Sequence, residues 1–268
     1  MSPTYKFAYC DLDQAEARIV AYKGGIHRMI ECFEAEGVKY TATDVHSLTA
    51  HSVLGVPYED LKEYPHRYLG KKCNHAFNYE MGPEKFYKVI AKDAADTGVR
   101  LTRSEAKQLR ARHFQTYPEL THYWEAIRGH LRRDRTLVNP MGRKRVFLGR
   151  LDADTFREAF SHYAQSTVAD VLRTGMVAVH NGPVHNLRSL GYQHTRIVLE
   201  VHDALLVQYP EECEDTFLPE VVQAMHIPFT VEGEEITIPV GVESGYNFGS
   251  RSDTNPNGLE EYVLKRAT

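Results

Sequence analysis

Apolar residues gather in short continuous runs near both ends of the chain, and between these runs they recur with helical spacing. A continuous apolar run predicts a buried strand, whereas a period of three to four residues predicts an amphipathic helix. Strands are expected over 5–10, 136–138, 145–148, 196–201, 205–209 and 236–242. Helices are expected over 13–23, 43–54, 64–80, 84–95, 103–114, 118–133, 153–180 and 214–226. Strands at both ends with helices between them predict an α+β fold.

Capping residues set two of these helix boundaries. Thr43 or Asp44 can cap the helix that follows them, and Thr102 or Ser104 can cap another. After Gly249 the chain is polar, and we expect this tail to be poorly ordered.

The composition is that of a folded protein without a membrane span. Of the 268 residues, 42% are hydrophobic and 25% are charged, which is too apolar for a disordered chain. No run approaches the roughly 18 apolar residues of a membrane span. The first twenty residues lack the basic and apolar regions of a secretion signal. The four cysteines show no zinc-ligand spacing, which favours free thiols and a cytoplasmic, non-secreted protein.

The net charge of −4 is the sum of two opposite parts. Residues 200–268 carry 14 Asp or Glu and 3 Lys or Arg, so residues 1–199 have a net charge of +7. The basic excess is highest in 128–150, where eight Lys or Arg accompany one Asp. Such a segment is either a solvated surface or one that contacts phosphates. The average charge therefore does not argue against a nucleic-acid ligand.

Two aspartates adjoin apolar strands. Asp11 follows the first strand in CDLDQAEAR, and Asp203 lies between two apolar runs in VLEVHDALLVQY. Two carboxylates that strands bring from distant segments are what a two-metal phosphoryl-transfer site requires. Each aspartate alone is equally compatible with a turn or a helix cap.

Polar side chains recur every fourth residue in the helix expected over 64–80. They are Arg67, Lys71, His75 and Tyr79. On a helix this spacing places them along one face. The two basic side chains could bind a polyphosphate, and the rings of His75 and Tyr79 could stack on a base. An ordinary amphipathic surface helix shows the same pattern.

The helix expected over 153–180 repeats this spacing. Arg157, Ser161 and Gln165 lie four residues apart. Such side chains could read the acceptors that every base pair presents in the minor groove. They could equally form only the polar face of the helix.

In the same order along the chain, these segments resemble motifs of the family A DNA polymerases, the bacterial DNA polymerase I-like family. Segment 11–18 (DLDQAEAR) is similar to the DYSQIELR of motif A. Arg67, Lys71, His75 and Tyr79 match the R-x3-K-x3-F/Y-x3-Y of motif B. Segment 201–204 (VHDA) resembles the V-H-D-E of motif C. Further similarities lie at 44–50, 142–145, 165–170 and 239–247, so the resemblance covers roughly residues 5–250.

The resemblance implies a DNA-directed DNA polymerase that adds dNTPs to a primer 3′-OH with two Mg²⁺ ions. The metal ligands would be Asp11, Asp203 and the carbonyl oxygen of Leu12. The nucleotide-binding residues would be Arg67, Lys71, His75, Tyr79, His46, Glu16 and Gln14. Lys71 would also be catalytic, as proton donor to the pyrophosphate, and Glu16 would exclude a 2′-OH. The residues that contact primer–template DNA would be Arg157, Gln165, His202, Ser161, Arg143 and Arg145.

Several positions depart from the family pattern. Ala204 replaces the Glu of motif C, and we expect a slower enzyme rather than an inactive one. His75 replaces the usual Phe or Tyr, which puts discrimination at the sugar 3′ position in doubt. The other departures are Asp13 at a Ser position, Ala76 at a Gly position and Ser161 at an Asn position.

The resemblance also implies an architecture. It assigns 1–30 and 136–250 to a palm with a small antiparallel sheet, 31–135 to helical fingers and 251–268 to a polar tail. The family's thumb and exonuclease regions have no counterpart in the sequence. We therefore expect a split, phage-like polymerase, in which a second polypeptide supplies the thumb and optionally the exonuclease. A bacterial or phage-infected cell would be its setting.

Two other functions fit parts of the sequence. A metal-dependent nuclease would use Asp11 and Asp13, which resemble the opening of an RNase H-type site. This function gives no role to the residues spaced by four from Arg67 to Tyr79. An inactive polymerase-derived subunit for DNA binding or assembly would need neither the aspartate pair nor the phosphate-binding residues. Primer extension that depends on dNTPs separates these alternatives.

Overall fold

The computed structural model describes residues 3–35 and 39–264 and divides the chain into two compact units. Unit 1 comprises residues 1–15 and 166–268, so its two segments come from opposite ends of the chain. Unit 2 comprises residues 16–165. The mixture of helices with small antiparallel sheets confirms the expected α+β class. The assignment of residues to a palm and to fingers stays a prediction.

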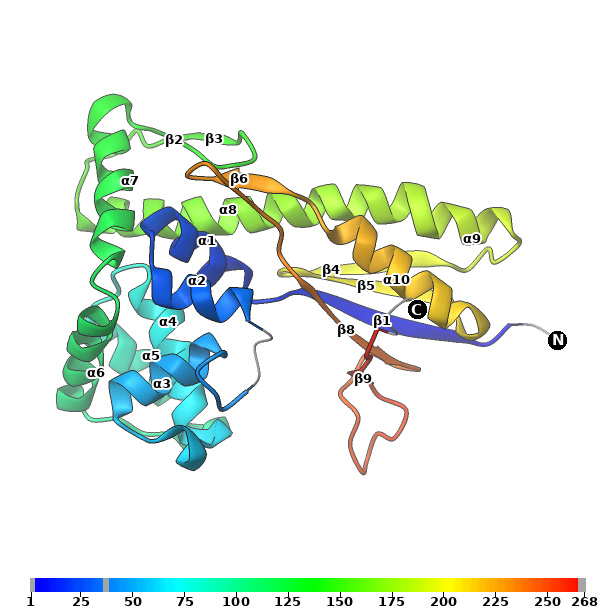
Figure 1. The fold of residues 1–268 in the computed structure, drawn as a ribbon, viewed down its shortest axis with the longest axis horizontal. Coiled ribbons are helices and arrows are strands. Elements are labelled where there is room, and N and C mark those ends of the chain that lie inside the picture. The colour runs from blue at the N-terminus through cyan, green and yellow to red at the C-terminus, as the bar shows by residue number, and fades with distance from the viewer. Residues whose placement is uncertain (1–2, 36–38, 265–268) are drawn as a thin grey trace. The chain divides into compact units, whose positions relative to one another are not determined.

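Unit 1 is built on an antiparallel sheet with the strand order β4-β5-β1-β8-β9 (Figure 1). The strands are β1 (Tyr5–Leu12), β4 (Arg196–Val201), β5 (Ala204–Pro210), β8 (Val240–Gly245) and β9 (Glu260–Glu261). In β5, Leu205, Leu206 and Val207 are at most 2% exposed, as expected for a continuous apolar run in a central strand. The register sets Asp11 of β1 opposite Ala204 of β5. The first strand of the chain is thus held between strands from its last third.

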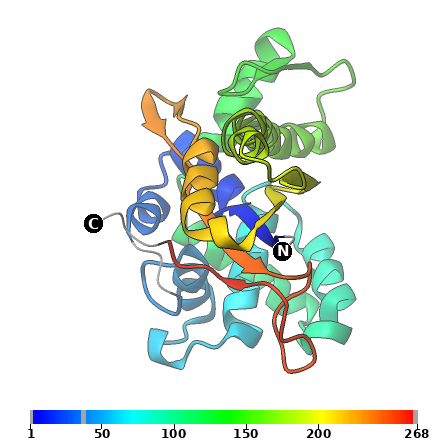
Figure 2. The ribbon, with the colours of Figure 1, turned by 90° about the vertical axis from the view of Figure 1, so that its right-hand side faces the viewer.

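Helices cover this sheet. The helical segments of unit 1 are α9 (His185–Ser189), α10 (Glu214–Met225) and the second half of α8 (Ala153–Val179). Helix α10 runs along one face of the sheet, where Phe217 stacks on Tyr209 with ring centroids 5.3 Å apart (Figures 1 and 2). Helix α8 approaches α10 at Gly175, where a β-carbon would lie 3.2 Å from the Cα of Met225. A residue without a side chain therefore permits this close helix contact.

One carboxylate ties α10 to three strands. Glu214 accepts hydrogen bonds from Lys6 of β1, from the Tyr209 hydroxyl of β5 at 2.5 Å and from the Ser244 hydroxyl of β8 at 2.9 Å. Burial would raise the pKa of Glu214, but these hydrogen bonds outweigh burial and hold the pKa below its usual value. The ionised side chain thus fastens the helix to the sheet.

The C-terminal part of unit 1 corrects two expectations. The single strand expected over 236–242 is wrong, because the segment contributes to β7 (Glu234–Ile236), which pairs with β6 (Phe229–Val231), and then to β8. Pro239, which cannot donate to a strand ladder, lies between the two strands. Residues 250–264 are not poorly ordered either: β9 pairs with β8, and the Arg251 amide donates to the Leu259 carbonyl at 2.9 Å.

Unit 2 is mainly helical. Its elements are α1 (Ala15–Gly24), α2 (His27–Glu34), α3 (Val45–Leu54), α4 (Tyr68–Phe77), α5 (Pro83–Thr97), α6 (Arg103–Thr116), α7 (Leu120–Asp134), the first half of α8, and the hairpin β2 (Thr136–Val138) with β3 (Lys144–Val146). Phe77, Phe86, Ile90 and Leu109 form part of a core that joins α4, α5 and α6. The burial of these apolar side chains, rather than helix propensity, holds such helices together.

Local signals account for several helix ends in unit 2. Asp44 caps α3 through a hydrogen bond from the Ser47 amide at 2.9 Å, and Gly55 ends α3 in the left-handed conformation with a φ of 74°. Thr102 and Glu105 form a capping box at the start of α6. The sequence-based expectations for these ends are confirmed.

Two aromatic residues of α7 join separate parts of unit 2. The Tyr123 hydroxyl donates to the Phe160 carbonyl of α8 at 2.5 Å. The Trp124 indole donates to the Asn78 carbonyl, just past α4, at 2.8 Å. Both rings are almost fully buried. Helix α7 therefore links the end of α4 to α8.

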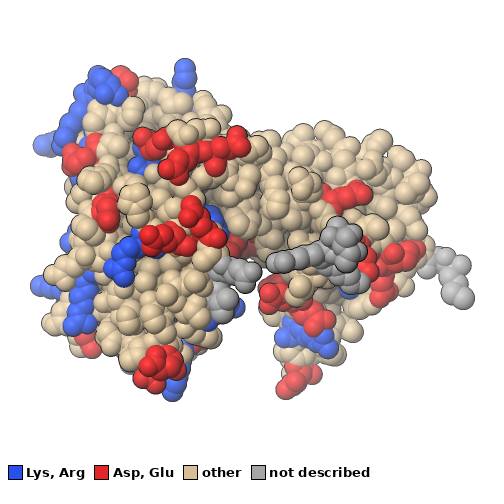
Figure 3. All heavy atoms as spheres, in the orientation of Figure 1, with Lys and Arg blue, Asp and Glu red and all other residues tan. Residues whose placement is uncertain are grey.

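The β2–β3 and β6–β7 hairpins carry charges of opposite sign. Lys and Arg gather over α6, α7 and the β2–β3 hairpin, whereas Asp and Glu gather over the β6–β7 hairpin (Figure 3). Exposed residues of these two hairpins include Arg143 and Lys144 on one and Glu234 and Glu235 on the other. Within the described residues, no helix is both long and apolar enough to cross a membrane.

Candidate active site

The sheet of unit 1 brings Asp11 and Asp203 to the same edge. Asp11 lies near the end of β1, and Asp203 lies in the turn that leads into β5. The Leu12 amide donates to the Asp203 carbonyl at 3.0 Å, and Asp11 is paired with Ala204. Because the end of β1 adjoins the start of β5, the two aspartates become neighbours through backbone pairing alone.

The β4–β5 turn fixes the position of Asp203. Val201 pairs with Ala204, so only His202 and Asp203 form the turn. His202 has a φ of 56°, a conformation that histidine and asparagine adopt more readily than β-branched residues. The predicted DNA contact His202 is exposed at this tip.

The charges of both aspartates act on Tyr9. Tyr9 is two residues before Asp11 on β1, so both side chains point to the same face of the sheet. Burial raises the pKa of Tyr9, and the negative charges of Asp11, Asp203 and Glu243 raise it further. This edge of unit 1 is therefore a site of concentrated negative charge.

The side chains at this edge fit a magnesium site. Mg²⁺ prefers oxygen ligands and is commonly held by one or two protein carboxylates, with substrate phosphates completing its coordination. Asp11 and Asp203 supply such carboxylates, and Leu12 supplies a nearby carbonyl. Among residues 3–35 and 39–264, no group of three or more His, Cys, Asp or Glu is arranged to hold a metal by itself. The donor set thus suits ions that are shared with a phosphate ligand.

The four motif B residues lie in unit 2, on α4 and on the turns that flank it. Helix α4 begins at Tyr68, so Arg67 lies in the π-turn before it (63–67), and Tyr79 lies two residues beyond its end. The helix expected from near Tyr64 or Pro65 to about Glu80 is therefore confirmed in its main part, although its first turn is π-helical and residues 78–80 form a turn. Tyr64 precedes a proline and is extended, with φ −116° and ψ 133°, because a residue before proline avoids the helical region.

Arg67 is held by an aspartate that sequence analysis treated only as a helix cap. Its Nε and Nη2 atoms lie 2.9 and 3.1 Å from the two carboxylate oxygens of Asp44, which is 1% exposed. Burial would raise the pKa of Asp44, but hydrogen bonds from Arg67 and Ser47 outweigh it and keep the pKa below its usual value. Asp44 therefore fixes the guanidinium of Arg67 in position.

A hydrogen bond also joins two of the predicted nucleotide-binding residues. The Tyr79 hydroxyl donates to Glu16 Oε2. Burial raises the pKa of Tyr79 well above its usual value, and the negative charge of Glu16 adds to this effect. Glu16, His75 and Tyr79 also line one small pocket together with Asn74. The structure thus brings Glu16 together with His75 and Tyr79.

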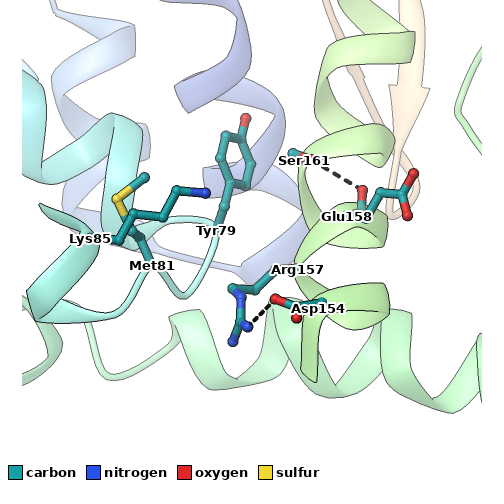
Figure 4. A pocket seen from close by; sticks show the side chains of 7 residues that line it. All are labelled: Tyr79, Met81, Lys85, Asp154, Arg157, Glu158 and Ser161. Carbon is teal, nitrogen blue, oxygen red and sulfur yellow. Dashed lines mark hydrogen bonds and ion pairs between the residues drawn. The ribbon is translucent and has the colours of Figure 1, made fainter. Parts of the chain in front are cut away.

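A larger pocket in unit 2 has a volume of about 320 Å³ (Figure 4). Tyr79, Met81 and Lys85 lie on one wall, and Asp154, Arg157, Glu158 and Ser161 of α8 lie on the other. Arg157 donates to Asp154 at 2.5 Å, and the Ser161 hydroxyl donates to the Glu158 carbonyl at 3.1 Å. Lys85 lines this pocket but was not predicted, because an isolated lysine in the first turn of a helix carries no signal of its own.

The remaining predicted DNA contacts lie on several elements. Gln165 is exposed on α8, two turns beyond Arg157. Arg143 is exposed in the β2–β3 turn, and Arg145 of β3 forms an ion pair with Glu158. In unit 1, the predicted nucleotide-binding residue Gln14 has a φ of 53°, and its buried Oε1 lacks a hydrogen-bond partner within the described residues. The DNA-binding roles of these residues stay predictions.

Comparisons with known proteins agree with the motifs. Residues 1–250 match the sequence profile described as DNA polymerase family A. DNA polymerase I of Pseudomonas aeruginosa is 27% identical over 248 residues, which are 90% of this chain and 24% of that protein. The thermostable DNA polymerase I of Thermus aquaticus is 28% identical over 209 residues, 75% of this chain and 22% of that protein. The chain therefore spans about a quarter of the length of these relatives.

A solved structure shares the fold. It is described as the POL domain of Pol1 from M. smegmatis in complex with DNA primer-template and dNTP. Its TM-score is 0.71 with 22% sequence identity, over 90% of this chain and 39% of that one. The profile match covers nearly the whole sequence. The chain belongs to DNA polymerase family A.

Proposed function

We propose that this chain is a DNA-directed DNA polymerase that adds dNTPs to the 3′-OH of a primer paired with a template. The adjacency of Asp11 and Asp203 on neighbouring strands of unit 1 is the observation that carries the proposal. Family membership and the solved polymerase with the same fold support it. A cytoplasmic setting in a bacterial or phage-infected cell is part of the same proposal and is supported by similarity to bacterial polymerases.

The proposal gives unit 1 the metal-binding carboxylates. Asp11, Asp203 and the Leu12 carbonyl would hold two Mg²⁺ ions. Such ions, when bound, neutralise charge on the reacting phosphate and lower the pKa of the attacking hydroxyl. Ala204 is fully buried beside Asp11, and its lack of a carboxylate is expected to slow the reaction without abolishing it.

The proposal gives unit 2 the nucleotide. Arg67 and Lys71 would bind the triphosphate as cations, and Lys71 would donate a proton to the departing pyrophosphate. His46 would add a hydrogen bond to the same phosphates. His75 and Tyr79 would contact the base and sugar, and Gln14 would assist them.

Glu16 would exclude ribonucleotides. Its hydrogen bond with Tyr79 holds the carboxylate in one place, which suits a residue that must clash with a 2′-OH. The DNA would be contacted, mainly in its minor groove, by Arg157, Ser161, Gln165, His202, Arg143 and Arg145. These groups act by positioning and charge rather than by covalent chemistry.

We also propose that a second polypeptide supplies the thumb. Strand β4 is the edge of the sheet, and its Val198 and Leu199 are 39% and 45% exposed. An exposed edge strand presents unpaired backbone groups with which another chain can pair. Processive primer extension by the purified chain alone would contradict this part of the proposal, whereas short, distributive extension is expected.

Primer extension tests the polymerase assignment. The wild-type chain, with Mg²⁺, primer–template and all four dNTPs, should lengthen the primer. Asp11→Ala should abolish extension without altering the unfolding transition. Asp13→Asn is the matched control, because the Asp13 side chain is exposed and the substitution leaves the hydrogen bond from its backbone amide to the Pro239 carbonyl in place. This variant should retain most activity. Cleavage of DNA without dNTP incorporation, dependent on both Asp11 and Asp13, would support a nuclease instead.

A further inference from the structure

A buried polar network lies beneath the nucleotide-binding face of unit 2. Asn74 of α4 is fully buried and lies one residue before His75. Its amide nitrogen lies 3.2 Å from His46 Nδ1, and its amide oxygen lies 3.0 Å from the Thr49 hydroxyl and 3.1 Å from His113 Nε2. One side chain thus joins α3, α4 and α6.

Close packing of two helix backbones holds this network in place. A β-carbon on Gly70 would lie 2.1 Å from the His46 carbonyl oxygen, so only glycine allows α4 to lie this close to α3. Asn74 lies one helical turn after Gly70, which brings its short side chain within reach of the His46 ring. The contact is therefore built into the packing of the two helices.

The surroundings of Asn74 determine the orientation of its amide. Its nitrogen lies 3.4 Å from the Val45 carbonyl, which can only accept a hydrogen bond. The opposite orientation would place two acceptor oxygens together there. It would also force the His113 proton onto Nδ1, which has no hydrogen-bond partner within the described residues. Buried N–H groups without a partner are rarer than unpaired acceptors.

This orientation fixes the proton on His46. Because the Asn74 amide nitrogen donates, His46 Nδ1 must accept and cannot carry a proton. Burial lowers the pKa of His46 to about 3, so the ring is neutral and its single proton is on Nε2. The groups that act electrostatically on the ring are Asp44, which raises its pKa, and Arg67, His75 and Lys71, which lower it.

We propose that Asn74 is a positioning residue that keeps His46 in its neutral, Nε2-protonated form, so that the ring presents an N–H group to the nucleotide triphosphate. In this role His46 binds phosphate as a hydrogen-bond donor, while the charges come from Arg67 and Lys71. The naming of the triphosphate rests on the proposed function, whereas the control of the His46 proton does not.

Nitrogen-15 NMR of the histidine rings in the full chain tests the proton assignment without any substrate. His46 should be neutral and protonated at Nε2 from pH 6 to pH 8. Asn74→Asp is nearly isosteric and preserves an acceptor for Thr49 and His113, but it replaces the donor that faces His46. In this variant His46 should carry a proton on Nδ1. A wild-type ring that is charged, or protonated at Nδ1, would overturn the proposal.

The KM for dNTP tests the functional consequence. In Asn74→Asp, His46 should be charged at low pH and should lose its Nε2 proton as the pH rises. The ratio of variant to wild-type KM should therefore increase between pH 6 and pH 8.5, on the order of tenfold, with little change in kcat. Thr49→Val is the matched control, because it disturbs the same network on the side away from His46.

The outcomes separate the two proposals. Equal KM profiles for Asn74→Asp and Thr49→Val would show that the network is only structural and would overturn the positioning role. A chain that extends no primer, but whose His46 has the expected proton, would refute the proposed function and leave the link between Asn74 and His46 in place.

Discussion

Units 1 and 2 fix their candidate functional groups by different means. In unit 1, Asp11 and Asp203 become neighbours because the backbones of β1 and β5 pair in one register. In unit 2, Arg67 and His46 are held by individual buried side chains, Asp44 and Asn74. The proposed metal-binding edge therefore depends on the fold of the sheet, whereas the proposed nucleotide-binding face depends on a few polar contacts whose loss is costly.

The largest expected difference between the two units is in how strongly acid lowers their free energy of unfolding, because unit 2 buries two neutral histidines. Burial lowers the pKa of His46 and of His113 to about 3. Unfolded histidine titrates near pH 6.5, so between these values the unfolded state binds more protons. The contribution of each neutral histidine to the free energy of unfolding is fully present above pH 6.5. It decreases as the pH falls, by up to about 2 kcal/mol per histidine at pH 5.

Urea unfolding followed by the fluorescence of Trp124, which lies in unit 2, measures this effect. Hydrogen exchange of the β5 amides reports on unit 1 in the same samples. His113→Gln should weaken the pH dependence. A free energy of unfolding for unit 2 that changes by less than about 1 kcal/mol between pH 7.5 and pH 5 would contradict the prediction.

Asp44→Asn should be the most destabilising single substitution of the set in unit 2. Asparagine still caps a helix, so the change isolates the ion pair with Arg67. Removal of the buried partner leaves Arg67 with only the more exposed Glu63, 3.5 Å away, so a cost of up to about 3 kcal/mol is expected. Urea unfolding and the KM for dNTP should both change. Arg103→Ala is the control: it breaks the exposed pair with Glu84 and should cost no more than about 0.5 kcal/mol.

Asp203→Glu tests whether the sheet register sets the metal-binding geometry. The added methylene displaces the carboxylate by roughly one carbon–carbon bond, and a misplacement of about 1 Å at a reacting centre can cost about 10²-fold in rate. Single-turnover extension should slow by about this factor while the unfolding midpoint stays constant. Wild-type rates in Asp203→Glu would show that the turn is too flexible to define the site.

Glu214→Gln should have the smallest effect. The substitution keeps the shape but replaces an ionised acceptor of three hydrogen bonds with a neutral one. A cost of about 1 kcal/mol is expected, because the other contacts of α10 remain. Hydrogen exchange should increase in α10 and β5 and stay unchanged in unit 2. Equal increases in both units would indicate that they unfold together.

Local sequence signals predicted much of the fold. The caps at Asp44 and Thr102 and the apolar run that became β5 identified their elements, because each acts over a few residues. The π-helical turn at 63–67 was not predicted, because the side-chain period continues across it. The two strands around Pro239 were merged for a similar reason: the apolar residues are continuous while the hydrogen bonding is not.

The candidate site was predicted as a set of residues but not as a set of contacts. Motif spacing identified Asp11, Asp203 and Arg67. The partners Asn74 and His113 are 39 residues apart, and no local pattern connects them. Asp44 was recognised as a cap, yet its ion pair with Arg67 spans 23 residues and depends on how α3 packs against the turn before α4.

The two-residue turn at His202 and Asp203 has a consequence for how this chain can vary in length. A one-residue insertion or deletion in β1 or at this turn would rotate a carboxylate to the opposite face of the sheet, because strand side chains alternate. In natural or laboratory variants, gaps should therefore be absent near residues 5–12 and 201–210, even where the amino acids themselves differ.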